Sequence, residues 1–429
     1  MREHATESYS LAFDKYALVT LFACAYAVVI GPFLLSGDPT PSTATDIQNA
    51  SPNLVVRIFI PAIATVTVVM AVRNRDRLRR WPVHLLCLFA YVAFAGASIV
   101  WAFRPEASFV RFAQQVMLLS SIVLPAMLAS RTSDLMRGVF LCFAAGSVLN
   151  VVFGYQTPIG YAGYLPGKNA LGQFSGMALL FAFHETLYPG SRRLFGIAIA
   201  GISVLLLMWS DSKTAFALAF FSPLLAGLVF AFTRVTRASP AIALVAALIF
   251  YASLASFYDF GMNNVSEVLY NDPTLTGRTH IWHFAFSEIA QRPVFGWGYQ
   301  SFWLVGSDAP SVVEAPGWIA NMPNAHNGYY DTILELGYVG LGLLILFILT
   351  TLHRLAGVVD FRRMWLLLSI ALYVIMYNCL ETIWMHGSEP LWVVFMIVAV
   401  EVARHTQPDS AEFPSQAPSF VPAGPHGSS

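Results

Sequence analysis

The chain has 429 residues, of which 57% are hydrophobic and 11% are charged. Soluble domains carry about 45–50% apolar and about 25% charged residues, so this composition excludes a soluble enzyme and a disordered protein. Its 24 basic residues balance 24 acidic ones, which leaves no net charge to attract a nucleic acid. The composition indicates a helical protein that crosses a membrane many times.

A hydrocarbon core of about 30 Å requires roughly 20 apolar residues per helix. The apolar runs of this chain are long and continuous, which favours helices over the short alternating strands of a membrane barrel. The sequence therefore predicts an all-α, polytopic integral membrane protein with about twelve transmembrane helices. The expected spans are 16–35, 54–72, 82–103, 112–129, 135–155, 170–188, 194–209, 214–232, 240–257, 328–352, 364–380 and 389–403.

The spans divide the chain into four parts. Residues 1–257 are expected to hold the first nine helices, and residues 258–327 form one long connection with an amphipathic helix. The last three helices fall in 328–404. Residues 405–429 are rich in Pro, Ser, Gly and Ala, which predicts a disordered cytoplasmic tail.

Basic residues in short loops predict the orientation. The connection 73–80, RNRDRLRR, carries five arginines and is assigned to the cytoplasm. Alternation from there places both termini in the cytoplasm and the connection 258–327 in the periplasm. Six basic residues then lie on the outer side, where either chance or a function retains them. These are Arg104, Arg111, Lys168, Lys213, Arg278 and Arg292.

The segment 276–303, TGRTHIWHFAFSEIAQRPVFGWGYQSFW, is predicted to begin with a helix. Its first apolar residues have helical spacing, and Pro293 and Gly296 end the pattern. Arg278 falls in the first turn, where the helix terminus already favours an anion. This position suits a phosphate-bearing ligand, or equally a helix that lies on the membrane with Arg278 at a lipid headgroup.

His326 and Asn327 stand at the mouth of the tenth span. A histidine there suits a general base, although such a residue is also commonly structural. Gly337 and Gly340 lie one turn apart deeper in the span, a spacing that lets helices approach closely. Glu335, inside the span, is expected to face a basic partner or a helix-terminal donor.

Two more polar clusters fall on the outer side. Lys168 and Asn169 begin the sixth span, and Ser212 and Lys213 join the seventh span to the eighth. Each cluster puts a lysine beside amide or hydroxyl groups at a helix start, an arrangement that binds anions. Such residues are also ordinary helix caps, so each cluster alone is weak evidence.

Together these elements resemble the O-antigen ligase and polymerase superfamily (Wzy-type), and they are most similar to exopolysaccharide repeat-unit polymerases. The resemblance covers about 155–345. Its motifs are Gly-Lys168-Asn169-x-x-Gly172, Ser210-x-Ser212-Lys213-Thr214, Gly277-Arg278-x-x-x-Trp282, Arg292-Pro293-x-x-Gly296-x-Gly298 and His326-Asn327 followed by Gly337-x-x-Gly340. Many ligases have arginine at the position of Lys213, and a lysine lacks the bidentate fork.

The resemblance implies a glycosyltransferase of the bacterial inner membrane whose active site faces the periplasm. The implied donor is an oligosaccharide on undecaprenyl pyrophosphate, used in exopolysaccharide or O-antigen biosynthesis. The acceptor is a glycan, either another lipid-linked chain in a polymerase or the lipid A core in a ligase. The bilayer and other polysaccharide export proteins are expected partners, and nucleic acid is not.

The resemblance also implies roles for residues. His326 and Arg278 are the expected catalytic residues, with His326 accepting the proton of the attacking hydroxyl. Lys213, Arg278 and Lys168 are expected to bind the pyrophosphate leaving group. The expected mechanism needs no metal or cofactor and inverts the anomeric configuration. The expected supporting residues are Asn169, Ser212, Asn327, Glu335 and Trp282.

Aromatic residues of the outer connection are expected either to stack on sugars or to form an interfacial belt. These are Trp282, Trp297, Tyr299, Phe302, Trp303 and Trp318.

A flippase for lipid-linked sugars is the main alternative function, and a structural assembly partner is a third. A flippase needs charged groups along a path through the membrane, whereas the ionisable candidates here gather at one face.

Overall fold

The computed structural model describes residues 13–35, 54–78, 80–157, 160–258, 275, 277–387 and 389–406. The predicted tail beyond residue 406 and part of the long connection, 259–274, lie outside these residues. Most of the described residues are helical. The strands β1 (Tyr155–Thr157) and β2 (Gly160–Gly163) pair antiparallel in a two-stranded sheet.

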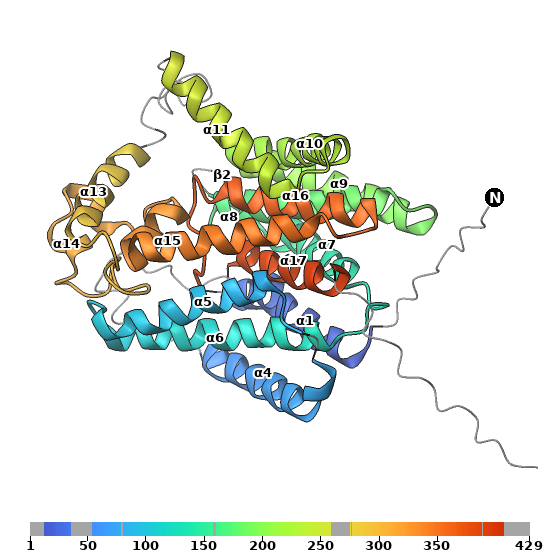
Figure 1. The fold of residues 1–429 in the computed structure, drawn as a ribbon, viewed down its shortest axis with the longest axis horizontal. Helices are drawn as coiled ribbons and strands as arrows, with labels where there is room; N and C mark the ends of the chain where they lie inside the picture. The colour runs from blue at the N-terminus through green and yellow to red at the C-terminus, as the bar shows by residue number, and fades with distance from the viewer. Residues whose placement is uncertain are drawn as a thin grey trace, which may run out of the picture.

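The helices pack into a bundle whose axes run mostly horizontally in Figure 1. In chain order they are α1 (Lys15–Ala25), a π-helical turn (Tyr26–Ile30), α2 (Gly31–Leu35), α4 (Leu54–Arg73), α5 (Val83–Ala97), α6 (Pro105–Leu128), α7 (Leu135–Phe153), α8 (Lys168–Thr186), α9 (Ser191–Ser210), α10 (Lys213–Thr236), α11 (Pro240–Tyr258), α13 (Arg278–Gln291), α14 (Pro310–Val313), α15 (Gly328–Leu355), α16 (Phe361–Tyr377) and α17 (Pro390–Thr406). Short 3-10 helices occupy Arg75–Arg77, Ser98–Trp101 and η4 (Gly317–Asn321).

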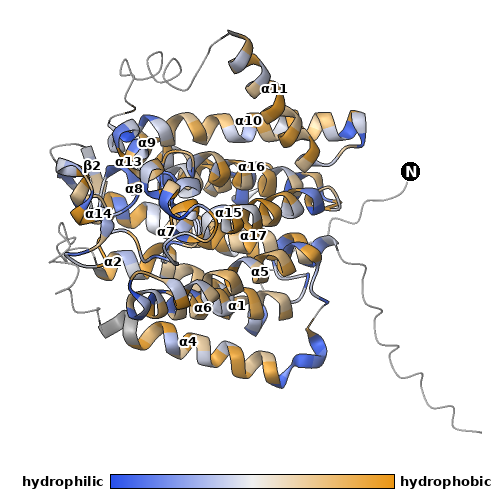
Figure 2. Ribbon diagram, turned by 60° about the vertical axis from the view of Figure 1, so that its left-hand side comes forward, coloured by the Kyte–Doolittle hydropathy of each residue, from blue (hydrophilic) through white to orange (hydrophobic). Residues whose placement is uncertain are grey.

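Eight of the described helical stretches are long and apolar enough to cross a membrane. They are Lys15–Leu34, Val83–Trp101, Pro105–Leu128, Leu135–Phe153, Ser191–Ser210, Lys213–Thr236, Pro240–Phe257 and Gly328–Leu355. All twelve predicted spans coincide with helices, but four of these helices are not among the eight: α4, α8, and the 17-residue α16 and α17. The count of twelve therefore stays a prediction. Figure 2 shows apolar residues along the middle of the bundle and hydrophilic residues gathered at both ends.

The bundle is centred on α17, which packs against α5, α6, α8, α15 and α16. Every residue from 391 to 404 is buried. A helix that is apolar all round, as most of α17 is, is stable only inside other protein or lipid. Because α17 is enclosed by other helices, its two ends are held in place, and charged side chains lie near both of them.

The part of the long connection after residue 276 is a packed cap. Its helices α13 and η4 enclose a second apolar core with the start of α15. Four of the aromatic residues expected either to stack on sugars or to form an interfacial belt lie in the interior and are at most 6% exposed, so neither expectation holds for them. They are Trp297, Tyr299, Phe302 and Trp303. Hydropathy alone does not separate a membrane-surface aromatic belt from such a core.

Gly337 breaks α15, with φ of 65°. Beyond the break, the Tyr338 N–H donates to the Pro293 carbonyl at 2.8 Å. A Cβ on Gly337 would lie 2.1 Å from the Val294 carbonyl oxygen, so only glycine fits. The close approach predicted from Gly337 and Gly340 therefore exists at Gly337, but its partner is the backbone of the connection and not another helix.

Three basic residues of the predicted outer side attach the connection to the bundle or to itself. Arg104 forms an ion pair with Asp308, Arg111 donates to the Gln300 carbonyl, and the Arg292 guanidinium lies 4.0 Å from the centre of the Trp297 ring. Structural contacts thus account for the position of these three, and the other three lie elsewhere at the same end.

Candidate active site

Three helices that begin at one end of the bundle carry a basic residue at their first position. They are α8 with Lys168, α10 with Lys213 and α13 with Arg278. None has an acidic residue in its first turn. A cation is unfavourable at a helix N-terminus, and the backbone N–H groups there favour an anion. We call this end of the bundle the site end; it lies on the left in Figure 1.

Three side chains converge at the site end on Glu381, in the turn after α16. Arg278 Nη2 donates to Oε1 at 2.8 Å, and Asn169 Nδ2 donates to the same oxygen at 3.2 Å. His326 Nδ1 lies 2.9 Å from Oε2. We call these four residues the Glu381 cluster. Its three ionisable side chains, those of Arg278, Glu381 and His326, are 16%, 18% and 28% exposed, so the cluster is held by the protein yet open on one side.

The charge of Glu381 fixes the proton of His326. Burial alone would raise the pKa of Glu381, but the hydrogen bond with His326 and the positive charges beside it outweigh burial and lower that pKa. A carboxylate only accepts hydrogen bonds, so His326 Nδ1 carries the proton that they share. In a neutral imidazole the other nitrogen, Nε2, is then an acceptor, which is the state required of a general base.

The backbone at His326 is unusual. Its φ is 49°, a left-handed conformation that histidine, asparagine and aspartate adopt more readily than other side chains. The His326 N–H donates to Asn324 Oδ1 at 2.9 Å. Trp282 Nε1 donates to the carbonyl of Ala325 at 3.0 Å. Trp282 therefore positions the histidine loop from α13.

Asp331, in the first turn of α15, links the two halves of the cluster. Its carboxylate accepts the Ala325 N–H, with both oxygens at 3.1 Å, and the Thr382 hydroxyl. Ala325 precedes His326, and Thr382 follows Glu381. One buried carboxylate thus fixes the backbone beside the imidazole and beside its acceptor.

Asn327 is the N-cap of α15. Its Oδ1 accepts the N–H groups of Tyr329 and Tyr330 at 3.0 and 3.2 Å, which satisfies donors that the helix leaves unpaired. Its Nδ2 donates to the Cys379 carbonyl at 3.0 Å. Asn327 therefore holds the start of α15 against the turn that carries Glu381.

The segment with Ser212 and Lys213 lies beside the cluster. The Tyr377 hydroxyl donates to the Asn169 carbonyl at 3.4 Å and also hydrogen-bonds the Ser212 side chain. A Cβ on Gly172 would lie 2.6 Å from that of Ser212, so glycine there permits the close packing of α8 and α10. Lys213 follows directly and its side chain is exposed.

Lys168 Nζ lies 3.9 Å from Asp211 Oδ2, a carboxylate with a 73% exposed side chain. Exposed ion pairs contribute about 0–1 kcal/mol, so this one is easily exchanged for another anion. Glu335 lies apart from the cluster, where its carboxylate accepts the Gln300 N–H and Arg111 attracts it. The hydrogen-bond partner of Glu335 is thus the backbone of the connection, and Arg111 acts on it only through its charge.

Sequence reasoning missed Glu381, Asp331 and Tyr377. Glu381 had a detectable signal, because it directly follows the span predicted at 364–380 and so falls on the same face as His326. Asp331 and Tyr377 lie inside helices and give no such signal. Among the residues that the structure describes, no group of three His, Cys, Asp or Glu side chains could hold a metal ion.

Fold and site are those of a multi-span membrane protein with a polar centre at one end of its bundle. Residues 198–345 match the family model described as O-antigen ligase (Wzy_C), which confirms the resemblance found in the sequence. The matched segment contains Lys213, Arg278 and His326. It ends before Glu381 and begins after Lys168.

The chain is also similar to curated proteins. The exopolysaccharide production protein ExoQ of Rhizobium meliloti (strain 1021) is 28% identical over 284 residues, 62% of this chain and 64% of ExoQ. A putative polysaccharide ligase of Rickettsia prowazekii (strain Madrid E) is 28% identical over 142 residues, 31% of this chain and 35% of the ligase. A putative polysaccharide ligase of Rickettsia conorii is 26% identical over 138 residues, 30% of this chain and 33% of the ligase. The matches thus span less than two thirds of each relative's length.

Proposed function

We propose that this protein is a membrane glycosyltransferase that moves an oligosaccharide from a lipid-linked pyrophosphate to a sugar hydroxyl, with the Glu381 cluster as its active centre. The observation that carries the proposal is the meeting of an imidazole, a guanidinium and an amide on one carboxylate, beside three helix starts that carry cations. The O-antigen ligase match and the similarity to ExoQ support the class of substrate.

His326 is the general base in this proposal. Its Nε2 takes the proton of the attacking hydroxyl, while Glu381 holds the ring by Nδ1 and stabilises the imidazolium that forms. A base in this position contributes typically ~10²–10⁴-fold to the rate. Attack from the side opposite the leaving group inverts the anomeric configuration.

The leaving pyrophosphate gains negative charge as its bond to the anomeric carbon breaks, and fixed cations stabilise that charge. Arg278, Lys213 and Lys168 take this role, each at the start of a helix, where unpaired backbone N–H groups also favour an anion. A guanidinium has five donors, so the Nη2 bond from Arg278 to Glu381 is compatible with binding a diphosphate. The proposal assigns charge neutralisation to these side chains, without a metal.

The proposed donor is a repeat unit on undecaprenyl pyrophosphate, and the site end faces the periplasm. Orientation is supported by the arginine-rich connection after α4, which lies at the other end of the bundle in Figure 2. There Tyr16, in α1, donates to Asn74 at 2.8 Å. We propose polymerisation as the first candidate because ExoQ, named for exopolysaccharide production, matches twice as much of this chain as the ligases do.

The decisive experiment uses His326→Ala in the deletion strain, with His353→Ala as the matched control. His353 lies at the far end of α15, where its Nδ1 is 3.1 Å from Ser239 Oγ. His326→Ala is expected to abolish polymer and accumulate lipid-linked repeat units at normal protein level, as is Arg278→Ala. The control is expected to retain polymer. Normal polymer from His326→Ala removes the histidine from the mechanism.

Purified protein separates transfer from translocation. Lipid-linked oligosaccharide that yields longer glycan and free undecaprenyl pyrophosphate indicates a transferase, whereas movement across the bilayer with no bond change indicates a flippase.

Ligation to the lipid A core is the second candidate, because the Rickettsia relatives are named putative polysaccharide ligases. Loss of extracellular polymer with intact lipopolysaccharide in the deletion strain supports polymerisation, and rough lipopolysaccharide supports ligation.

A further inference from the structure

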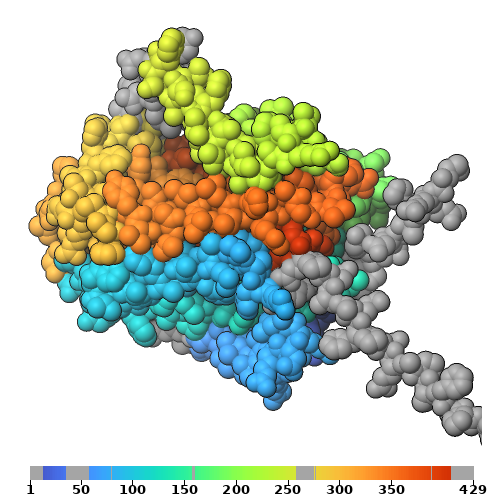
Figure 3. Space-filling view, viewed as in Figure 1, coloured from blue at the N-terminus to red at the C-terminus, as the bar shows by residue number. Residues whose placement is uncertain are grey.

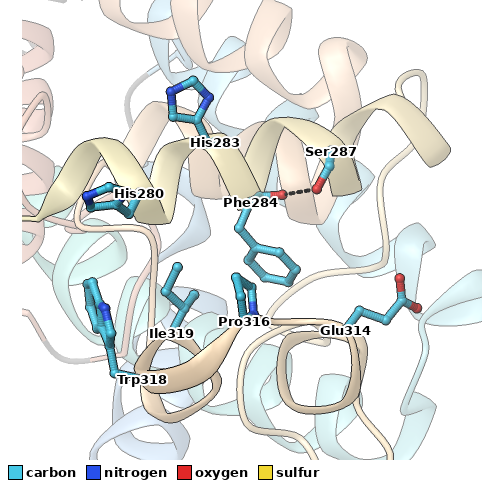
Figure 4. A pocket seen from close by; sticks show the side chains of 8 residues that line it. All are labelled: His280, His283, Phe284, Ser287, Glu314, Pro316, Trp318 and Ile319. Atoms are coloured by element: carbon cyan, nitrogen blue, oxygen red, sulfur yellow. Dashed lines mark hydrogen bonds between the residues drawn. The ribbon is translucent and has the colours of Figure 1, made fainter.

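A pocket of about 610 Å³ lies between α13 and the segment that contains η4 (Figure 4). Small-molecule sites commonly have volumes of about 300–1,000 Å³, so this one accommodates a ligand of more than one ring. It is separate from the Glu381 cluster, and none of the residues assigned above to the reaction lines it.

The lining combines an apolar floor with polar edges. Phe284, Pro316 and Ile319 form the middle of the pocket in Figure 4. His280 and Trp318 lie towards one end, and Ser287 and Glu314 towards the other. Trp318 is 49% exposed, in contrast to the buried tryptophans of the cap. A sugar ring offers one apolar C–H face and a rim of hydroxyls, which this arrangement matches.

The charge of the pocket differs from that of the Glu381 cluster. Among the residues that the structure describes, no lysine or arginine lines it; Glu314 contributes a carboxylate, and His280 and His283 contribute imidazoles. Glu288, buried behind it, has a pKa raised to about 7 by burial and by the nearby Glu314. A carboxylate accepts hydrogen bonds from neutral hydroxyls, which a saccharide offers around its ring.

The pocket and the Glu381 cluster share their two supporting segments. A Cβ on Gly277 would lie 3.5 Å from the Trp318 ring, so the indole packs beside the residue that precedes Arg278. On the other side, η4 ends at Asn321, a few residues before His326 in the chain. A glycan that reacts at His326 and extends along α13 would therefore reach this pocket.

We propose that this pocket is a saccharide subsite, in which sugar residues next to the reacting one stack on Trp318 and hydrogen-bond Glu314 and Ser287. The inference rests on the proposed function for the identity of the glycan. The same chemistry is offered by the glycan of the donor and by that of the acceptor, and the experiment separates them.

Direct binding is the first test. The probe is a set of oligosaccharides made by partial hydrolysis of the host's own extracellular polymer, added to the full chain in nanodiscs and followed by saturation-transfer NMR. Trp318→Ala is expected to weaken binding about three- to tenfold, the range of an aromatic contact. Phe286→Ala, an exposed aromatic of α13 outside the pocket, is the matched control and is expected to leave binding unchanged. Equal binding by Trp318→Ala and the wild type overturns the subsite.

Kinetics then identify the source of the glycan. A higher KM for a free acceptor oligosaccharide in Trp318→Ala, with kcat unchanged, assigns the pocket to the acceptor. A higher KM for the lipid-linked donor assigns it to the donor, and no change in either KM overturns the proposal. If the wild type forms no product at all, the proposed function fails, while the NMR comparison still decides whether the pocket binds saccharide.

Discussion

The two ends of the bundle both gather charged side chains, but only one of them balances its charges in the interior. At the end opposite the site, each buried carboxylate meets a guanidinium. The pairs are Glu185 with Arg192 at 2.6 Å, Asp134 with Arg192 and Arg363 at 3.8 and 3.7 Å, and Glu401 with Arg363 at 2.9 Å and with Arg404. These side chains are 0–14% exposed.

The site end is arranged differently. Glu381 pairs with Arg278 and His326. Lys213 is exposed, and Lys168 forms an ion pair with the exposed Asp211. A recess opens between α13 and α11 on the face seen in Figure 3, and residues from the red, C-terminal part of the colour scale lie at its floor. A closed ion network stabilises a fold, whereas cations left at open helix starts suit a ligand that carries the missing negative charge.

Arg404→Ala is expected to have the largest effect on the protein itself. Arg404 is fully buried, pairs with Glu401 and donates to the Ser133 carbonyl at 3.2 Å. Removing it leaves Glu401 with less compensation, and breaking a buried pair costs about 3–5 kcal/mol. We expect little folded protein in the membrane by immunoblot and fluorescence-detected size exclusion.

A double variant, Arg404→Met with Glu401→Leu, tests the cause of that loss. It removes both charges of the pair, and apolar replacement of a whole buried pair is often tolerated; Arg363 loses Glu401 but keeps Asp134 at 3.7 Å, so recovery is incomplete. Partial recovery of folded protein is expected. A normal level of folded Arg404→Ala protein would mean that the ion pairs at the end opposite the site contribute little to stability.

Glu381→Gln is expected to lower kcat about 10²-fold at a normal protein level, because the ring of His326 loses its orienting carboxylate. The amide also removes the negative charge that stabilises the imidazolium formed when the ring takes the proton. Rates of product formation by the purified variant and the wild type test this expectation. A kcat equal to that of the wild type would exclude Glu381 from orienting the base.

Local signals explain which parts of the site the sequence predicted. Arg278 lies in the first turn of α13 and Asn327 begins α15, because apolar spacing and helix-ending Pro and Gly residues act over a few positions. Glu381 meets His326 across 55 residues and Asn169 across 212. Such a contact depends on how α8, α15 and α16 pack together, and the hydropathy of the sequence does not predict that packing.

Gly337 illustrates the same limit. The pair of glycines predicted a close approach, and Gly337 does provide one, but the identity of the partner depends on the path of the connection after Arg292. In the same way, the aromatic run 297–303 predicted a ligand or a membrane surface and instead fills a core. The residue type predicts what kind of contact forms, whereas the partner in that contact depends on the tertiary fold.

Lys213→Ala is expected to have a smaller effect than changes in the cluster. An exposed lysine that binds the diphosphate gives a charged hydrogen bond, so we expect the KM for the lipid-linked donor to rise about tenfold. Lys213→Arg keeps the charge and is expected to remain active. Lys15→Ala, at the start of α1 on the opposite end, is the matched control. Full activity of Lys213→Ala would exclude Lys213 from diphosphate binding.

The smallest expected effect concerns the acid pair of the cap, Glu288 and Glu314, which forms no ion pair with a cation among the residues that the structure describes. Gln291 Nε2 donates to Glu288 Oε1 at 3.1 Å and to Glu314 Oε2 at 3.4 Å. Burial and Glu314 raise the pKa of Glu288 to about 7, so the folded chain holds a proton that the unfolded chain has released. Stability therefore falls as pH rises from the ordinary pKa of a glutamate to about 7.

Glu288→Gln removes this titration and keeps an oxygen that can accept the bond from Gln291. We expect its melting temperature in detergent to exceed that of the wild type by about 2–4 °C at pH 8 and to equal it at pH 5. Glu106→Gln, an exposed acid at the start of α6, should change neither value. A difference of the same size at both pH values would mean that packing, and not the unbalanced charge of the cap, distinguishes the variant.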